Sequence, residues 1–125
     1  QHVLEPLNGY LILAQKIHTS QIKKEKQNWN FGPSISCCKS VKYVSNFFAK
    51  NLNLKVKTNS KQKNNFKPET SILRLSNFKS RKILNWHPKW NLDTSLKKII
   101  EWNENIIKYN VRKVCESQII EFLKR

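Results

Sequence analysis

The chain contains no methionine and only two glycines among its 125 residues. Gly9 and Gly32 stand alone and far apart. A dinucleotide-binding turn or a P-loop needs closely spaced glycines, because only glycine lets the backbone approach a pyrophosphate at the start of a helix. The 125 residues therefore contain neither phosphate-binding fingerprint. The start at Gln1, without a methionine, predicts that the sequence is truncated.

Long apolar runs and metal-binding patterns are also missing from the sequence. No apolar stretch approaches the roughly 18 residues needed to span a bilayer. Glu5 and Asn8 interrupt the N-terminal apolar segment, which excludes a secretion signal. Cys37, Cys38 and Cys115 form no C-x-x-C pair and no cysteine–histidine ligand spacing. We therefore expect no metal site, no membrane partner, reduced thiols and a cytoplasmic location.

Acidic residues are scarce: eight Asp and Glu oppose 24 Lys and Arg, which gives a formal net charge of +16. A charge of this size is typical of proteins that bind polyanions such as nucleic acid. Most of the basic residues are lysines, however, whereas arginine is better suited to bidentate contacts with phosphates and bases. The pattern favours compositional drift, and a basic nucleic-acid-binding module stays open as an alternative.

Apolar residues recur at helical spacing in several segments of the chain. The predicted helices are 6–19, 41–52, 78–84, 92–109 and 117–123. Ser40 and Asn77 are predicted N-caps, Pro88 prevents a further helix after 78–84, and Asn91 or Asp93 caps the next one.

Short apolar or alternating segments predict strands between these helices. The predicted strands end at Val3-Leu4 or cover 29–31, 54–58 and 72–75. Strands that alternate with helices indicate an α/β fold, although too few strands are present for a complete doubly wound sheet. Residues 59–67 are polar and basic, and we expect an exposed loop there.

Few residues form a pattern that would support catalysis. Tyr109 and Lys113 have the Y-x-x-x-K spacing of an acid/base pair, but no cofactor fingerprint precedes them, so a chance surface pair is favoured. His2, His18 and His87 are scattered and do not suggest a metal site. The aromatic residues could stack on bases, yet a core role is favoured for the set Trp29, Phe31, Trp86, Trp90 and Trp102.

Two blocks carry a resemblance to a known family. The first is Gln1 to Ala14, which reads Q-H-V-L-E-P-L-N-G-Y-L-I-L-A, and N-F-G-P follows at 30–33. The second block resembles E-x-x-x-L-x-L-D-x-S-K-A-R-x-x-L-G-W-x-P-x-W-x-L. Its matching residues are Glu69, Leu73, Leu75, Lys79, Arg81, Leu84, Trp86, Pro88, Trp90 and Leu92. In this order the motifs resemble the CDP-glucose 4,6-dehydratases, which are extended short-chain dehydrogenases/reductases. Ser76, Phe78 and Asn85 depart from the Asp, Ser and Gly of that pattern.

The resemblance implies a fold, a cofactor and a reaction. It implies the C-terminal portion of a Rossmann-type fold, mainly the substrate-binding lobe, helix-rich with a few short strands. Residues 28–58 would contribute the last strand-helix unit of the NAD domain. The full-length enzyme would be a homodimer that uses NAD to convert CDP-glucose to CDP-4-keto-6-deoxyglucose, a step of deoxysugar biosynthesis. The NAD-binding glycines and the acid/base tyrosine would all lie before Gln1.

The resemblance also indicates two substrate-binding residues. Glu69 corresponds to a carboxylate that accepts both ribose hydroxyls in related dehydratases, and Lys67 lies close enough in sequence to meet a diphosphate. A solvated loop position remains the alternative for each. We expect the Trp86–Trp90 corner and the opening helix to share a cleft beside Glu69.

These expectations define the sequence-based prediction for the chain. It is the sugar-nucleotide-binding region of a dehydratase, with no catalytic residue, no bound cofactor and no activity of its own. A decayed, non-functional remnant is a further alternative to the nucleic-acid-binding module.

Overall fold

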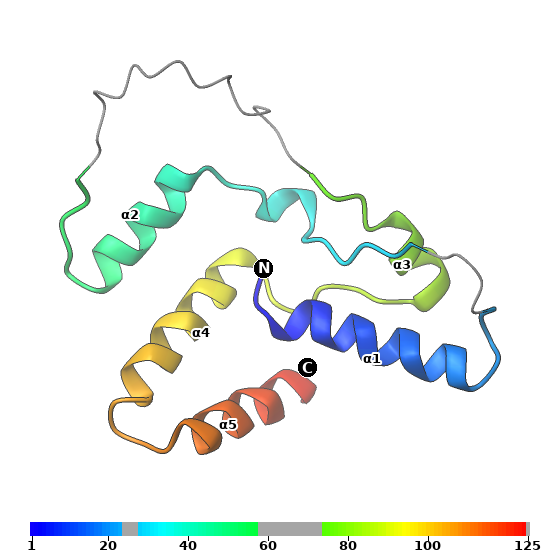
Figure 1. The fold of residues 1–125 in the computed structure, drawn as a ribbon. Helices are drawn as coiled ribbons and strands as arrows, with labels where there is room; N and C mark the ends of the chain where they lie inside the picture. The colour runs from blue at the N-terminus through cyan, green and yellow to red at the C-terminus, as the bar shows by residue number, and fades with distance from the viewer. Residues whose placement is uncertain (24–27, 58–73, 125) are drawn as a thin grey trace, which may run out of the picture.

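The computed structural model describes residues 1–23, 28–57 and 74–124 (Figure 1). Its helices are α1 (Leu4–His18), the 3-10 helix η1 (Ile35–Cys37), α2 (Val41–Asn51), α3 (Phe78–Leu84), α4 (Leu92–Asn105) and α5 (Val111–Leu123). α1 packs against α3, and α4 contacts both α2 and α5. The N-terminus lies beside the first turn of α4 (Figure 1). Among the described helices, none is long and apolar enough to cross a membrane.

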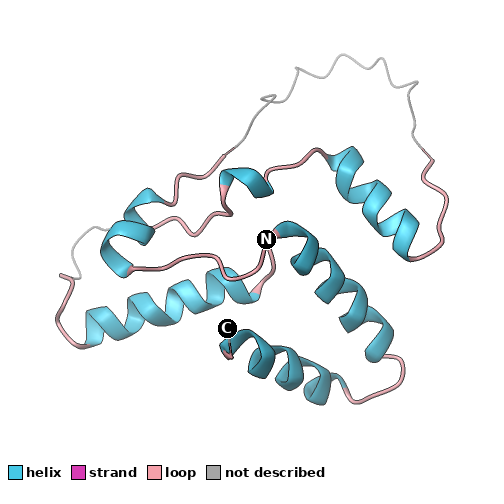
Figure 2. Cartoon of the chain, turned by 180° about the vertical axis from the view of Figure 1, so that it is seen from behind, coloured by secondary structure: helices cyan, strands magenta, loops and turns pink. Residues whose placement is uncertain are grey.

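The predicted α/β fold is wrong for the described residues, because they form helices and loops and no strand (Figure 2). Leu4 begins α1 instead of ending a strand. Residues 29–31, 54–57 and 74–75 have no regular secondary structure. The remaining positions of the predicted strands, 58 and 72–73, lie outside the described residues, as does the predicted loop 59–67.

The segment 28–32 shows why a strand pattern does not make a strand here. In a strand, the backbone N–H groups of a neighbouring strand donate hydrogen bonds to the carbonyl groups. In segment 28–32, side chains donate these hydrogen bonds instead. The donors are Lys79 Nζ to Asn28 O (3.1 Å), Ser80 Oγ to Asn30 O (2.5 Å), Gln1 Nε2 to Phe31 O (2.6 Å) and Asn77 Nδ2 to Gly32 O (2.8 Å). The segment is thus held against α3 and the N-terminus by side-chain hydrogen bonds.

The predicted helices are confirmed, and two of the predicted caps are confirmed with them. The Ser40 hydroxyl accepts a hydrogen bond from Tyr43 N–H at 3.2 Å, and Asn91 Oδ1 accepts one from Thr94 N–H at 2.8 Å. Both contacts satisfy backbone donors that a first helical turn leaves without a partner. The predicted cap at Asn77 is wrong, because its side chain makes no capping bond and binds Gly32 O instead.

Two helix boundaries differ from the prediction by more than two residues. α4 ends at Asn105, four residues before the predicted end, and α5 begins at Val111, six residues before the predicted start. Asn110 causes the early start, because its Oδ1 accepts a hydrogen bond from Arg112 N–H at 2.9 Å. Ile107, counted in the apolar stripe of the predicted helix, lies in the turn between the two helices and is 82% exposed.

Asn85 takes the left-handed conformation at the end of α3 that the glycine of the family pattern would take. It ends α3 with φ 55° and ψ 29°, in the left-handed region. Asparagine tolerates this region better than other non-glycine residues, because its short polar side chain can bond locally. The chain therefore still reverses sharply after α3. The reversal returns Trp86 to that helix, where the backbone N–H of Trp86 donates to Ser80 O at 3.2 Å.

The core is small and aromatic. Phe31, Leu84 and Trp86 form its centre, and the Phe31 and Trp86 rings meet edge to face with centroids 5.2 Å apart. Trp90 forms a second buried contact with Phe122 of α5, centroid to centroid 5.0 Å. The predicted core role is thus confirmed for Phe31, Trp86 and Trp90, while Trp29 and Trp102 are half-buried.

Candidate functional site

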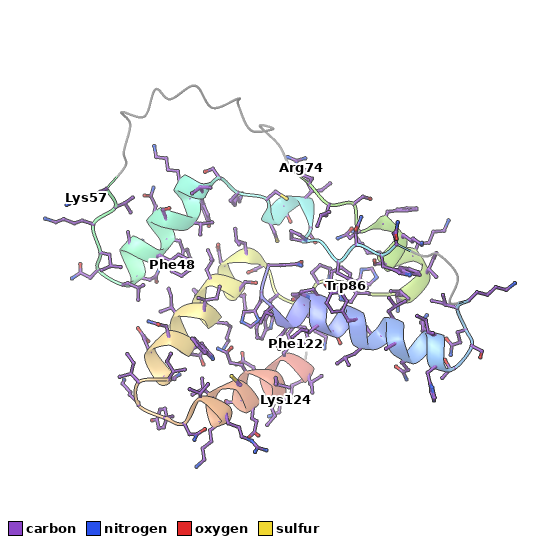
Figure 3. The ribbon with its side chains drawn as sticks, viewed as in Figure 1. Phe48, Lys57, Arg74, Trp86, Phe122 and Lys124 are labelled. Atoms are coloured by element: carbon purple, nitrogen blue, oxygen red, sulfur yellow. The ribbon has the colours of Figure 1, made fainter. Side chains whose placement is uncertain are left out.

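A pocket of about 650 Å³ opens between the segment before η1 and the approach to α3. Pro33, Ser34 and Ile35 form one wall, and residues 74–78 form the facing wall. Arg81 and Lys82 of α3 and His87 after it complete the lining. Figure 3 shows Arg74 on the strip of chain that leads into α3, on the outer side of the molecule, with Trp86 further inside. We refer to it as the Arg74–Arg81 pocket.

The described residues that line the pocket carry positive charge. They include Arg74, Arg81 and Lys82, and none of them is Asp or Glu. Six acidic residues lie in the described part of the chain; Glu5 is inside the core, and the others are on α4 and α5: Asp93, Glu101, Glu104, Glu116 and Glu121. The salt bridges among described residues also involve only α4 and α5. The positive charge of the pocket is therefore not neutralised by a described acidic side chain.

Arg81 is oriented by a short chain of side-chain hydrogen bonds. Its Nε–H donates to His87 Nδ1 at 3.3 Å, and His87 Nε2 lies 3.3 Å from Asn85 Oδ1. Because Nδ1 accepts, the neutral ring of His87 carries its proton on Nε2 and donates to Asn85. This arrangement uses Nε of the guanidinium and leaves its terminal nitrogens as further donors.

Asn77 joins the two walls of the pocket. Its Nδ2 donates to Gly32 O at 2.8 Å and lies 3.4 Å from Pro33 O. The wall that carries Arg74 is thereby tied to the wall that carries Ser34 and Ile35. The pocket is thus built by contacts between residues that are 44 and 45 positions apart in the sequence.

Glu5 is the most unusual side chain of the described structure. It is completely buried, on the first turn of α1. Oε1 accepts hydrogen bonds from Lys89 N–H at 3.0 Å and Trp90 N–H at 2.7 Å, and Oε2 lies 3.1 Å from Lys89 N. The backbone carbonyl of Glu5 accepts a further bond from Trp86 Nε1 at 3.2 Å. These contacts confirm that the opening helix and the Trp86–Trp90 corner pack together, but the predicted cleft beside Glu69 lies outside the described residues.

Sequence reasoning missed this role of Glu5. The available signal was a carboxylate in the first turn of a helix whose other residues are mostly apolar, followed far along the chain by a proline turn. A carboxylate that accepts backbone N–H groups in a dry site is well satisfied and holds structure, so Glu5 is a positioning residue for the turn at 88–90.

His2 is buried beside the turn at 88–90, which the Glu5 carboxylate holds. Its ring meets Trp90 edge to face with centroids 4.9 Å apart, and Nδ1 accepts a hydrogen bond from Leu4 N–H at 3.3 Å. Burial, helped by nearby positive charges that include Lys98, lowers the pKa of His2 below its usual value of 6.5. The folded chain therefore holds this imidazole neutral at a pH where the unfolded chain protonates it.

This difference predicts a loss of stability in acid. Below the usual pKa of 6.5, His2 binds a proton in the unfolded state but stays neutral in the folded state until its lowered pKa is reached. The free energy of unfolding therefore falls as the pH falls. Urea unfolding at about pH 7.5 and about pH 5.5 should show a larger loss for the natural chain than for His2→Asn, whose side chain does not titrate. Equal losses in the two proteins would contradict the assignment.

Other residues that the sequence suggested do not come together as a site. Glu69 and Lys67 lie outside the described residues. Tyr109 lies in the turn before α5 and is 62% exposed, so it does not share a helix with Lys113. Within 1–23, 28–57 and 74–124, no group of three His, Cys, Asp or Glu side chains could hold a metal ion. All three cysteines are free, and Cys115 Sγ lies 3.4 Å from Trp102 Nε1.

The glycines do not offer a dinucleotide cradle. A Cβ placed on Gly9 would overlap the ring of Phe31, and one on Gly32 would lie 3.0 Å from both the side chain and the carbonyl oxygen of Leu75. Each glycine is needed for close packing within the chain, and neither faces open space. The described residues by themselves therefore do not fit NAD.

No protein-family model matches the chain. Over 122 residues, however, it is 33% identical to the CDP-glucose 4,6-dehydratase of Salmonella typhimurium. The chain is similar to a CDP-glucose 4,6-dehydratase. The match covers 96% of this chain and 33% of the Salmonella protein, so the chain spans about a third of the length of this relative. The resemblance predicted from the two sequence blocks is thus confirmed.

Proposed function

We propose that this chain is the sugar-nucleotide-binding C-terminal region of a CDP-glucose 4,6-dehydratase. The observation that carries the proposal is the 33% identity to the Salmonella dehydratase over nearly the whole chain. The agreement of the two sequence blocks in order, together with the packing of the first block against the second through Glu5, supports the same assignment.

The proposal separates binding from chemistry. In the whole enzyme, NAD would supply the hydride transfer of the dehydration, and the present residues would hold the nucleotide sugar. The sequence contains no glycine-rich turn, and the described glycines are closed by Phe31 and Leu75. We therefore expect the 125 residues alone to bind substrate without converting it, and we derive no step through NAD.

Glu69 and Lys67 are the proposed substrate contacts. Glu69 would accept hydrogen bonds from the two ribose hydroxyls, and Lys67 would face the diphosphate. The support is their place in the second sequence block, five and seven residues before Arg74. That residues 28–58 contribute to the NAD domain of a longer enzyme also stays a prediction. So do a homodimeric assembly of the whole enzyme and a cytoplasmic location, the latter supported by three free thiols.

The test combines an activity assay with a binding assay. With NAD and CDP-glucose added, the isolated chain should form no 4-keto product. Glu69→Gln keeps the shape of the side chain and removes its charge, so it should weaken CDP-glucose binding about tenfold.

Glu104→Gln is the matched control, because Glu104 lies on α4 among the exposed residues. It should leave the affinity unchanged. Product formation by the isolated chain would contradict the proposed lack of activity. Equal affinities of Glu69→Gln and Glu104→Gln for CDP-glucose would contradict the proposed role of Glu69 in binding.

A further inference from the structure

We propose that the adjacent thiols of Cys37 and Cys38 form a chelating site for trivalent organic arsenicals, with the organic group seated in the pocket beside Cys38. The site lies at the end of η1 and shares no residue with the proposed substrate contacts. Binding there needs neither a nucleotide nor NAD, so the site is independent of the proposed function. Two features support it: a pair of accessible thiols on a fixed turn, and a mainly apolar pocket next to one of them.

The exposure of these two cysteines is unusual. Free cysteine is among the most buried residue types, yet Cys38 is exposed and Cys37 is half-buried. Neither thiol is in a disulfide, and neither belongs to the buried core. The thiol of Cys38 donates only a weak hydrogen bond, to Ser34 O at 3.9 Å, which a ligand can replace. Both sulfur atoms are therefore accessible to a reagent in solution.

The backbone holds the two thiols next to each other. Adjacent Cα atoms are about 3.8 Å apart, which brings both sulfur atoms within reach of one bridging atom. Cys37 N–H donates to Ser34 O at 2.9 Å, and Cys38 N–H donates to Ile35 O at 3.1 Å. These bonds fix the turn that carries both side chains, so little backbone freedom is lost when a ligand joins them. Attachment of the second sulfur is then intramolecular, which strengthens binding by about 10²–10⁴.

The chemistry of the pair selects the class of ligand. Thiolate sulfur is a soft ligand and favours soft partners, and arsenic with one organic substituent needs two sulfur atoms to complete its three bonds. In water, phenylarsine oxide is a trivalent arsenic with two As–OH groups. Each As–O bond and each S–H bond breaks, two As–S bonds form, and two water molecules leave. Arsenic stays trivalent, so the reaction needs no oxidant or reductant.

The pocket beside Cys38 suits the phenyl group of this reagent. It has a volume of about 180 Å³, and its other lining residues are Pro33, Ile35, Leu75 and Arg74. A protein cavity of about 150 Å³ is large enough to hold benzene. Leu75 belongs to the segment before α3, so the chain fold and not the local sequence places it beside the thiols.

The experiment is a titration of the 125-residue chain with phenylarsine oxide in an excess of mercaptoethanol, and native mass spectrometry counts the arsenic atoms bound to each chain. The monothiol keeps the cysteines reduced and competes with attachment through a single sulfur. Cys37→Ser and Cys38→Ser each keep one of the two sulfur atoms. Cys115→Ser is the matched control, because it removes a thiol from α5. Far-ultraviolet circular dichroism verifies that each variant keeps its helices.

The natural chain and Cys115→Ser should each bind one arsenic atom with affinities within about twofold, and Cys37→Ser and Cys38→Ser should bind at least about a hundredfold more weakly. Addition of the dithiol dimercaptopropanol should remove the arsenic from the natural chain. Binding by Cys37→Ser or Cys38→Ser as tight as that of the natural chain would overturn the proposal. An equal loss of binding in Cys115→Ser would overturn it as well.

A fourth variant tests the place of the phenyl group. Leu75→Ala should weaken the binding of phenylarsine oxide about threefold and leave that of inorganic arsenite, which has no phenyl group, unchanged. Equal affinities of Leu75→Ala and the natural chain for phenylarsine oxide would overturn the placement of the phenyl group in this pocket.

Discussion

Replacing Glu5 with leucine is expected to lower the free energy of unfolding by about 4 kcal/mol, at about 2 kcal/mol for each buried donor left without a partner. The two donors are the N–H groups of Lys89 and Trp90, which bond to the Glu5 carboxylate at 2.7 to 3.1 Å. Domains of ordinary stability have a free energy of unfolding of about 5–15 kcal/mol, so this substitution should remove between about a quarter and about four fifths of it. Urea unfolding followed by circular dichroism measures the loss.

Two further variants give this prediction its controls. Glu5→Gln keeps one acceptor oxygen, replaces the other with an NH2 group and removes the charge, so it should cost less, about 1–2 kcal/mol. Glu104→Leu changes a carboxylate on the exposed face of α4 and should alter the stability by less than about 0.5 kcal/mol. If Glu5→Leu were as stable as the natural chain, the buried carboxylate would have no structural role and the joining of α1 to the turn at 88–90 would need another explanation.

The Trp86→Ala variant is expected to lose about 3–5 kcal/mol of stability, the usual cost of removing a large buried aromatic side chain. Trp86 is 1% exposed, its ring packs edge to face on Phe31, and its Nε1 bonds to the carbonyl of Glu5. The substitution therefore removes the centre of the core and one contact to α1 together. The same unfolding experiment measures it.

Comparison with other tryptophan variants separates these contributions. Trp86→Phe keeps most of the buried surface and loses the N–H donor, so it should cost about 1 kcal/mol. Trp29→Ala should cost less than Trp86→Ala, because Trp29 is half-buried and one face of its ring is covered by Lys79, with Nζ 4.4 Å from the centroid. A Trp29→Ala loss equal to that of Trp86→Ala would contradict the placement of the core.

Local signals in the sequence were sufficient for the positions of the helices. Ser40 and Asn91 are polar residues directly before an apolar helical period, and each caps its helix as expected. Periodicity alone misplaced the boundary between α4 and α5, because Ile107 continues the apolar spacing although it lies in an exposed turn. The structure shows that Asn110 caps α5, and periodicity does not report such a cap.

The strand predictions failed because a strand depends on its neighbours. Trp29-Asn30-Phe31 has the alternation of a strand, but whether a segment pairs is decided by which donors lie beside it. Here the donors are the side chains of Gln1, Asn77, Lys79 and Ser80. These side chains lie between 30 and 51 positions away in the sequence from the carbonyl groups that they bind. No local sequence pattern predicts contacts at that separation.

The candidate site was harder to predict than the helices for the same reason. Arg74 and Arg81 read as ordinary basic residues in a chain of charge +16, and only the fold brings them to one pocket with Ser34 and Ile35. Glu5 likewise needed the fold to meet Lys89 and Trp90, 84 and 85 positions away. The resemblance to the dehydratases predicted the class of substrate, a nucleotide sugar. The residues that line the pocket could be identified only from the structure.

The affinity of the 125-residue chain for CDP-glucose, measured by calorimetry at about 0.15 M salt with single-stranded DNA as the competing ligand, tests the central claim most directly. The account predicts saturable one-to-one binding of CDP-glucose, at least about tenfold tighter than that of UDP-glucose, whereas DNA binding weakens steeply as salt increases. DNA binding that survives this salt concentration, with no detectable binding of CDP-glucose, would contradict the account.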